Sequence, residues 1–157
     1  MSVRLEVSGL AAASVQAVWE EVVDWAGQYR WIPFTTVDVV SEQHTGLGVR
    51  AEALSGFRLA GRPIGLLDRF IVTGWRPPAE GRAELEVLHL GPYFTGEGVF
   101  ALAEDAGQTR ITCTEMINVP GGRLTELGVR ALLPVMRRGF RASLGSLSKL
   151  AESSPSR

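Results

Sequence analysis

The stretch that decides the fold is residues 83–118, AELEVLHLGPYFTGEGVFALAEDAGQTRITCTEMIN. Short turns divide it into three strand-like segments, Ala83–Leu90, Thr95–Ala103 and Thr109–Asn118. Strands joined by so few residues must be antiparallel, because a parallel connection needs a crossover of about a dozen residues or more. The stretch therefore predicts an antiparallel meander.

Further strands are expected upstream of this stretch. Val3, Leu5 and Val7 alternate with polar residues, which is the period-two pattern of a half-buried strand. Three more segments bounded by glycine or proline have the same character, namely Thr35–Glu42, Val49–Leu54 and Ile64–Trp75. The last one is expected to stop at Pro77-Pro78, because proline cannot donate a hydrogen bond to a neighbouring strand.

Helical periodicity marks two other regions. Ser14 is predicted to cap an amphipathic helix with Trp19 in its apolar stripe, and a short irregular helix follows it. A long helix is expected from Leu124 to Ala151, where Pro134 should kink it or divide it near residue 133. The side predicted to face the sheet contains Gly128, Leu132, Val135, Met136, Gly139, Leu147 and Leu150. The opposite side carries basic residues, namely Arg123, Arg130, Arg137, Arg138, Arg141 and Lys149.

Composition and charge limit the class of protein. With 45% apolar and 21% charged residues among 157, the chain is expected to fold as one domain, residues 1–152, followed by a disordered tail, 153–157. Sixteen basic against 17 acidic residues give no overall field that would favour nucleic acid. The sequence has no signal-peptide pattern and no apolar run of ~18 residues that could span a membrane. Because Cys113 is the only cysteine, no internal disulfide can form, and a cytoplasmic location is expected.

The order of elements, together with several short motifs, resembles the SRPBCC superfamily (START/Bet v 1-like, polyketide cyclase/dehydrase). The similar residues are Val18-Trp19 with Asp24, Trp31-Ile32-Pro33, Trp75-Arg76-Pro77-Pro78, Gly107–Thr112 and the terminal helix. The resemblance implies an α+β helix-grip fold, in which a curved antiparallel sheet wraps a long C-terminal helix, with two short helices after the first strand. It also implies an apolar cavity between sheet and helix. It does not imply one activity, because the superfamily includes lipid carriers, hormone receptors and cyclases.

Strand alternation indicates which polar side chains face that interior. Glu84 and Glu86 are expected to point to solvent, which turns Leu85, Val87 and His89 inward. The same reasoning turns Cys113 and Glu115 inward on the last strand. Parity on the Ile64–Trp75 strand is ambiguous and only slightly favours Asp68 facing inward. If all three do so, Asp68, His89 and Glu115 converge and perturb one another's pKa values.

Such a trio is more often a satisfied buried network than a catalytic site. As an alternative, Glu115 orienting or deprotonating His89 would suit proton abstraction next to a carbonyl. A further alternative is that one or two of the polar groups orient a mainly apolar ligand. The histidine-rich spacing typical of zinc sites is missing, so no metal and no cofactor are expected. Cys113 has no neighbouring cation in the sequence and fits a core residue better than a nucleophile.

Three hypotheses about function remain open. The leading one is a domain that binds a small apolar or aromatic molecule between sheet and helix, lined by Trp31, Val87, Cys113, Gly128, Leu132, Val135 and Met136. The second is a cyclase or dehydratase-like enzyme that uses His89 with Glu115 or Asp68. The third is an interaction domain whose last helix, through Arg137, Arg138 and Arg141, binds an acidic partner or anionic headgroups. The sequence does not decide the ligand or the oligomeric state.

Overall fold

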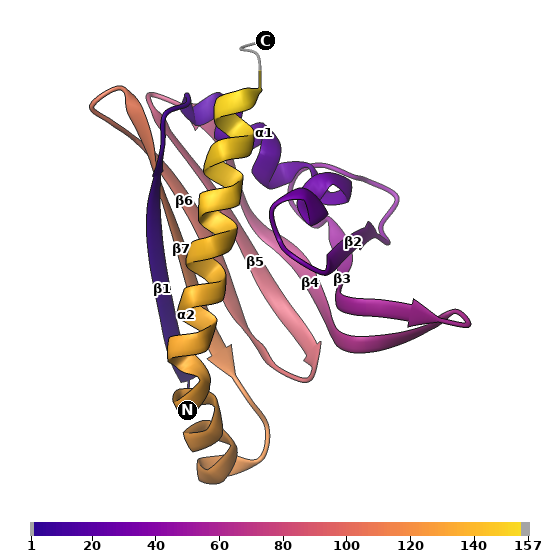
Figure 1. The fold of residues 1–157 in the computed structure, drawn as a ribbon. Helices are drawn as coiled ribbons and strands as arrows, with labels where there is room; N and C mark the ends of the chain where they lie inside the picture. Colours follow the sequence, from indigo (N-terminus) through magenta and orange to yellow (C-terminus); the bar gives the residue numbers. More distant parts are fainter. Residues whose placement is uncertain (1, 155–157) are drawn as a thin grey trace.

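The structure, a computed structural model, describes residues 2–154, apart from the side chains of residues 58 and 63. Its elements in chain order are β1 (Ser2–Ala11), α1 (Val15–Val23), the 3-10 helix η1 (Trp25–Arg30), β2 (Thr35–Val39), β3 (Arg50–Leu59), β4 (Arg62–Ala79), β5 (Arg82–Pro92), β6 (Thr95–Asp105), β7 (Gln108–Asn118) and α2 (Gly122–Ser153). A seven-stranded antiparallel sheet curves around α2, with α1 and η1 at one end (Figure 1). This is the helix-grip fold, which confirms the fold predicted from the sequence.

The strands are arranged in the order β1-β7-β6-β5-β4-β3-β2. Strands β2 to β7 form a meander, as expected, and the first strand joins the sheet beside the last one. The pairing of β1 with β7 runs from Ser2 opposite Asn118 to Ala11 opposite Thr109. The two edges of the sheet are therefore β1 and β2, and β3 to β7 lie in its interior.

Strand β4 is longer than the sequence predicts, because it continues through Pro77 and Pro78 to Ala79. The pairing of β4 with β5 is regular at Arg76 and shifts register before Ala79. Proline is tolerated at such an irregularity because the ladder does not need a donor there. The predicted stop at the two prolines is therefore wrong, and the strand bends instead of ending.

Helix α1 forms where the sequence predicts it. The Ser14 hydroxyl accepts a hydrogen bond from the Ala17 N–H at 3.1 Å, which is the expected N-terminal cap. Trp19 is only 5% exposed, and its ring meets that of Trp75 edge-on at a centroid distance of 5.1 Å. The helix thus places a large aromatic side chain against the sheet, within a core shared by α1, α2 and β1.

Helix α2 is one uninterrupted helix of 32 residues, although Pro134 lies inside it. Pro134 is exposed, so water can bond the carbonyl that the missing proline N–H leaves free. The predicted division near residue 133 is wrong. Two residues of the predicted tail are ordered, because Ser153 is helical and the Ser154 hydroxyl donates to Glu21 at 3.0 Å; the rest of the predicted tail, residues 155–157, lies outside the described residues.

The side of α2 that faces the sheet differs from the predicted one. The stripe that packs onto the core is formed by Leu133, Met136, Phe140, Leu144, Leu147, Leu150 and Ala151. Leu132 and Val135 are 57% and 69% exposed, and Gly128 and Gly139 also lie at the surface. Placing these four residues on the inner face is therefore wrong. The N-terminal half of the helix has two apolar stripes, and helical period alone does not show which one packs.

This corrected orientation predicts that Gly128→Ala and Gly139→Ala each stabilise the protein by about 0.5–1 kcal/mol. A Cβ atom at either position would have no heavy atom within 4 Å, so the substitution gains helix propensity without a clash. Urea unfolding of both variants measures the change. A loss of stability in both would contradict the exposed placement of these glycines.

No helix in the described part of the chain, residues 2–154, combines the length and the apolar character needed to cross a membrane.

Candidate functional site

Three ionisable side chains from three different strands meet on the side of the sheet that faces α2. Asp68 lies on β4, His89 on β5 and Glu115 on β7. His89 Nδ1 lies 2.7 Å from Asp68 Oδ2, and His89 Nε2 lies 3.1 Å from Glu115 Oε2. The convergence predicted from strand parity is thus present in the structure, and we call these three residues the His89 cluster.

The contact between His89 and Glu115 passes over an intervening strand. Strand β6 lies between β5 and β7, and its Gly98 is opposite both Val87 and Glu115 in the pairing register. A Cβ atom at Gly98 would lie 3.0 Å from Glu115 Oε2 and 3.0 Å from His89 Nε2. Glycine at this position therefore leaves the space in which the imidazole and the carboxylate meet.

The electrostatics of the cluster follow from its burial and its pairing. The three side chains are only 11–13% exposed. Burial alone would lower the pKa of His89, but hydrogen bonds and charge attraction from Asp68 and Glu115 outweigh it and raise the pKa to about 9. His89 is therefore an imidazolium at neutral pH, with both ring nitrogens donating. With both carboxylates ionised, the cluster carries one net negative charge.

Aromatic rings surround the imidazole. The ring centroid of Phe94 lies 5.1 Å from that of His89, and the centroid of Phe70 lies 6.4 Å from it. Phe70 in turn contacts Trp25 of η1 at 5.6 Å. These rings make the immediate surroundings of the imidazole apolar. The surroundings of the cluster thus suit an apolar, planar molecule.

The described part of the chain has buried polar side-chain atoms without a hydrogen-bond partner, and two of them concern this site. Among the described residues, neither Asp68 Oδ1 nor the indole N–H of Trp31 has a hydrogen-bond partner, and both are buried. Trp31 is 3% exposed and packs edge-on against Phe100 at 6.0 Å. An unpaired buried polar atom costs free energy, so each one marks a place where a bound molecule or water can contribute a hydrogen bond.

The remaining residues predicted to line the site separate into two groups. Val87 and Met136 pack against the core on the side that faces the helix, and Cys113 is fully buried, with its thiol 3.8 Å from Glu115 Oε1. Burial, together with the nearby Glu115, holds the pKa of the Cys113 thiol well above its usual range, so the thiol stays protonated. The structure does not bring Gly128, Leu132 and Val135 to the cluster, because they lie on the outer side of α2.

Sequence reasoning missed three residues of this site. Phe70 pairs with His89, but a register shift lies between Phe70 and Asp68, so parity counted from Asp68 does not place it. Gly98 and Phe94 gave no signal either. The role of Gly98 depends on the register between β6 and its two neighbours, and Phe94 lies in the turn after β5.

Gly98→Ala is expected to lower the pKa of His89 and to leave the fold intact. The added methyl group would press on the ends of the His89 and Glu115 side chains, which can move apart by a few tenths of an ångström. Their separation weakens the interaction that favours the imidazolium. Titration of the His89 ring protons by NMR measures the effect, and an unchanged His89 titration would contradict this arrangement.

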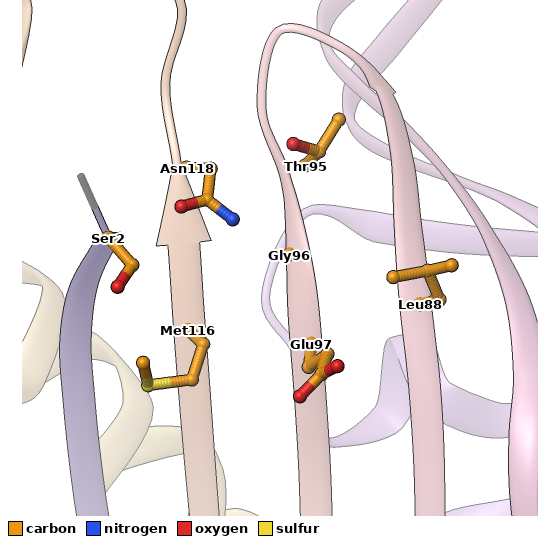
Figure 2. Close-up of a pocket in the computed structure, with 7 residues that line it drawn as sticks. All are labelled: Ser2, Leu88, Thr95, Gly96, Glu97, Met116 and Asn118. Atoms are coloured by element: carbon orange, nitrogen blue, oxygen red, sulfur yellow. The ribbon is translucent and has the colours of Figure 1, made fainter.

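Two shallow pockets lie on the opposite face of the sheet. The larger one, of about 350 Å³, is shown in Figure 2 and is lined by Ser2, Leu88, Thr95, Gly96, Glu97, Met116 and Asn118. Glu97 and Met116 flank Gly98 and Glu115 along their strands, and therefore point away from the His89 cluster. A smaller pocket, of about 220 Å³, lies next to it beside Thr73 and Val99. Neither pocket occupies the space between sheet and helix where a cavity is expected.

Comparison with known proteins identifies the fold. No family model and no curated protein matches the chain. Among solved structures, TTHA0849 from Thermus thermophilus superposes with a TM-score of 0.72 at 15% identity, covering 98% of this chain and 100% of that one. The ZhuI aromatase/cyclase from Streptomyces sp. R1128 gives 0.68 at 19%, covering 97% and 94%. DynU16, from the dynemicin biosynthetic locus, gives 0.59 at 18%, covering 96% and 47%. These likenesses, all below 25% identity, show that the chain shares the helix-grip fold of these proteins.

Proposed function

We propose that this protein binds a small, mainly apolar or aromatic molecule on the side of the sheet that faces α2, with the His89 cluster as its polar anchor. The observation that carries the proposal is Asp68 Oδ1, a buried carboxylate oxygen without a partner in the described structure, at the edge of a cluster flanked by Phe70 and Phe94. Small-molecule sites typically have a mainly apolar surface with a small number of polar groups that orient the ligand.

The cluster also indicates the polarity of the ligand. Both ring nitrogens of His89 are already paired with carboxylates, so the free hydrogen-bonding capacity belongs to Asp68 Oδ1, which is an acceptor. A hydroxyl on the ligand could donate to it. The net negative charge of the cluster disfavours a ligand carboxylate. The fitting ligand is therefore neutral and aromatic with a hydroxyl group.

Three naphthalene probes test this preference by tryptophan fluorescence titration. We expect 2-naphthol to bind more tightly than naphthalene and 2-naphthoate to bind most weakly. Asp68→Ala should remove the preference for the hydroxyl, an effect of about 10-fold or more, because a hydrogen bond to a charged acceptor is lost. Binding of the three probes with equal affinity would contradict the role of Asp68.

Glu97→Ala provides the matched control, because Glu97 is an exposed carboxylate on β6 that faces the opposite pocket. Binding of 2-naphthol should not change in this variant. If Glu97→Ala weakens binding and Asp68→Ala does not, the molecule binds to the outer face of the sheet and the proposal is wrong.

A second candidate is an enzyme that removes a proton next to a carbonyl, a class suggested by the aromatase/cyclase name of one structural neighbour. The raised pKa of His89 favours one assignment of roles. The Asp68 carboxylate, whose Oδ1 has no partner, would accept the proton from carbon, and the His89 imidazolium, with both N–H groups paired to carboxylates, would stabilise the developing negative charge on the carbonyl oxygen through its own charge. His89 as the base, which the sequence suggested, is disfavoured because it is already protonated.

Hydrogen–deuterium exchange at C1 of 2-tetralone tests this candidate without knowledge of the natural substrate. Proton NMR in D2O would show faster exchange with the wild-type protein than with buffer, and Asp68→Asn would remove the acceleration. Exchange at the buffer rate with the wild-type protein would leave only the binding function supported.

A further inference from the structure

The outer side of the N-terminal half of α2 is unusually apolar. Leu124 is 84% exposed, Leu127 65%, Leu132 57% and Val135 69%. At 100° per residue these side chains, with Ala131 between them, share one broad arc of the helix. Figure 1 shows the first turns of α2 extending beyond the end of the sheet, so this arc is open to an approaching surface. We call these four large residues the α2 outer patch.

The charge of the protein is unevenly divided between this helix and the remainder. Helix α2 contains six basic and two acidic residues, a net charge of +4, whereas the rest of the chain has ten basic and fifteen acidic residues, a net charge of −5. The net charge of the whole chain is therefore close to zero although α2 is strongly basic and the rest of the chain is acidic. A chain with this distribution turns its α2 side toward a negatively charged surface.

Arginines lie within and beside the α2 outer patch. Arg137, Arg138 and Arg141 are exposed and lie in the two turns after Val135; at 100° per residue Arg138 falls within the arc, Arg141 beside it, and Arg137 beyond Arg141. Within residues 2–154, no carboxylate forms an ion pair with any of the three, whereas Arg130 is paired with Glu126 at 2.7 Å. Their guanidinium groups are therefore available, and guanidinium binds phosphate oxygens in a bidentate manner.

We propose that the α2 outer patch and these three arginines dock the protein onto a membrane surface that carries anionic lipid headgroups. Exposed leucines beside arginines on one helix are the combination that holds an amphipathic helix in the plane of a membrane interface. A second copy of the chain fits this surface less well. Four aliphatic side chains supply far less than the ~800 Å² that a stable interface buries per partner, and two such helices would bring their arginines together.

Docking in this orientation would bring the β5–β6 turn to the membrane as well. Thr95 lies opposite Asn118, four residues before α2 begins, so that turn and the start of α2 lie at the same end of the sheet. Tyr93 in the turn is 55% exposed. Tyrosine is typical of the interfacial layer of a membrane.

Vesicle flotation tests the proposal with the full chain. We expect binding to vesicles of phosphatidylcholine with 30% phosphatidylserine, and at least a 10-fold weaker affinity for pure phosphatidylcholine. Arg137→Gln/Arg138→Gln/Arg141→Gln should weaken binding to the anionic vesicles by 10-fold or more, since each basic residue near the surface contributes about fivefold. Leu124→Ser/Leu127→Ser should weaken it independently, because the apolar contact is lost.

The matched control is Arg50→Gln/Arg62→Gln/Arg82→Gln, which removes the same charge from exposed positions outside α2. It should bind as the wild type does, apart from a small general electrostatic effect. Circular dichroism confirms that each variant is folded. The proposal is overturned if the wild type does not float with anionic vesicles, or if both arginine triples lose affinity equally. It is also overturned if light scattering shows a dimer that Leu124→Ser/Leu127→Ser abolishes.

Discussion

Replacing Trp19 by alanine is expected to lower the free energy of unfolding by about 3–5 kcal/mol, which is enough to unfold a domain of marginal stability. Trp19 is 5% exposed at the centre of the apolar side of α1, and its ring packs against Trp75. The substitution removes a large buried ring and leaves a cavity between helix and sheet that neighbouring backbone cannot fill. Urea unfolding followed by far-UV circular dichroism measures the loss.

Tyr29→Ala is the control for this prediction, because Tyr29 is an aromatic residue of the adjacent η1 that is 60% exposed. Its replacement should change stability by about 0.5 kcal/mol or less. A Trp19→Ala variant that melts close to the wild-type temperature would mean that α1 packs through another face.

Glu115→Gln is expected to lower the pKa of His89 from about 9 toward its ordinary value of 6.5. The amide removes one of the two charges that favour the imidazolium. The double variant Asp68→Asn/Glu115→Gln should take the pKa below 6.5, because burial, which lowers it, is then unopposed. NMR titration of the His89 ring protons measures both values.

The raised pKa of His89 also links stability to pH. A histidine whose folded-state pKa exceeds its unfolded value stabilises the protein fully below the unfolded pKa, here 6.5, and this contribution is lost as the pH rises through about 9. For this shift the contribution is about 3 kcal/mol. Stability measured by urea unfolding at pH 6 and pH 10 should therefore fall by less in Glu115→Gln than in the wild type.

A matched variant makes the titration decisive. Glu97→Gln, on the opposite face of β6, should leave the His89 titration unchanged. If Glu115→Gln also leaves it unchanged, the two side chains are not coupled, and both functions proposed for the cluster lose their structural basis.

Parity of the strands predicts much of this site but not all of it. His89 and Glu115 lie on strands with clear alternation, and both lie on the inner side, as parity indicates. Asp68 is ambiguous, because β4 shifts register relative to β5 between Asp68 and Phe70 and again between Val72 and Gly74. At each such irregularity the alternation of side chains is interrupted. The face on which a residue before the shift lies therefore does not predict the face of a residue after it.

For α2, prediction from the sequence fails for a different reason. Periodicity places Leu132 and Val135 on the inner side of α2, because they form a genuine apolar stripe with Gly128 and Gly139. A competing stripe through Leu133, Met136 and Phe140 makes the contact with the core instead. Periodicity shows which apolar residues share a face of the helix. Which of two apolar faces is buried depends on how the helix packs against the sheet. The excess apolar stripe is the one that the docking proposal uses.

The pairing of β1 with β7 has a consequence for how the chain acquires this structure during synthesis. Residues 2–11 leave the ribosome well before their partner strand, residues 108–118, which is made only after the intervening strands have been synthesised. Until then, β1 has no neighbour and its apolar side chains Val3, Leu5 and Val7 have no sheet to cover. Contacts this distant in sequence slow folding and expose a strand edge to association with other chains. Arg4 and Glu6 place charges on the other face of β1 while it is unpaired, and charged side chains on an exposed strand disfavour association with other chains.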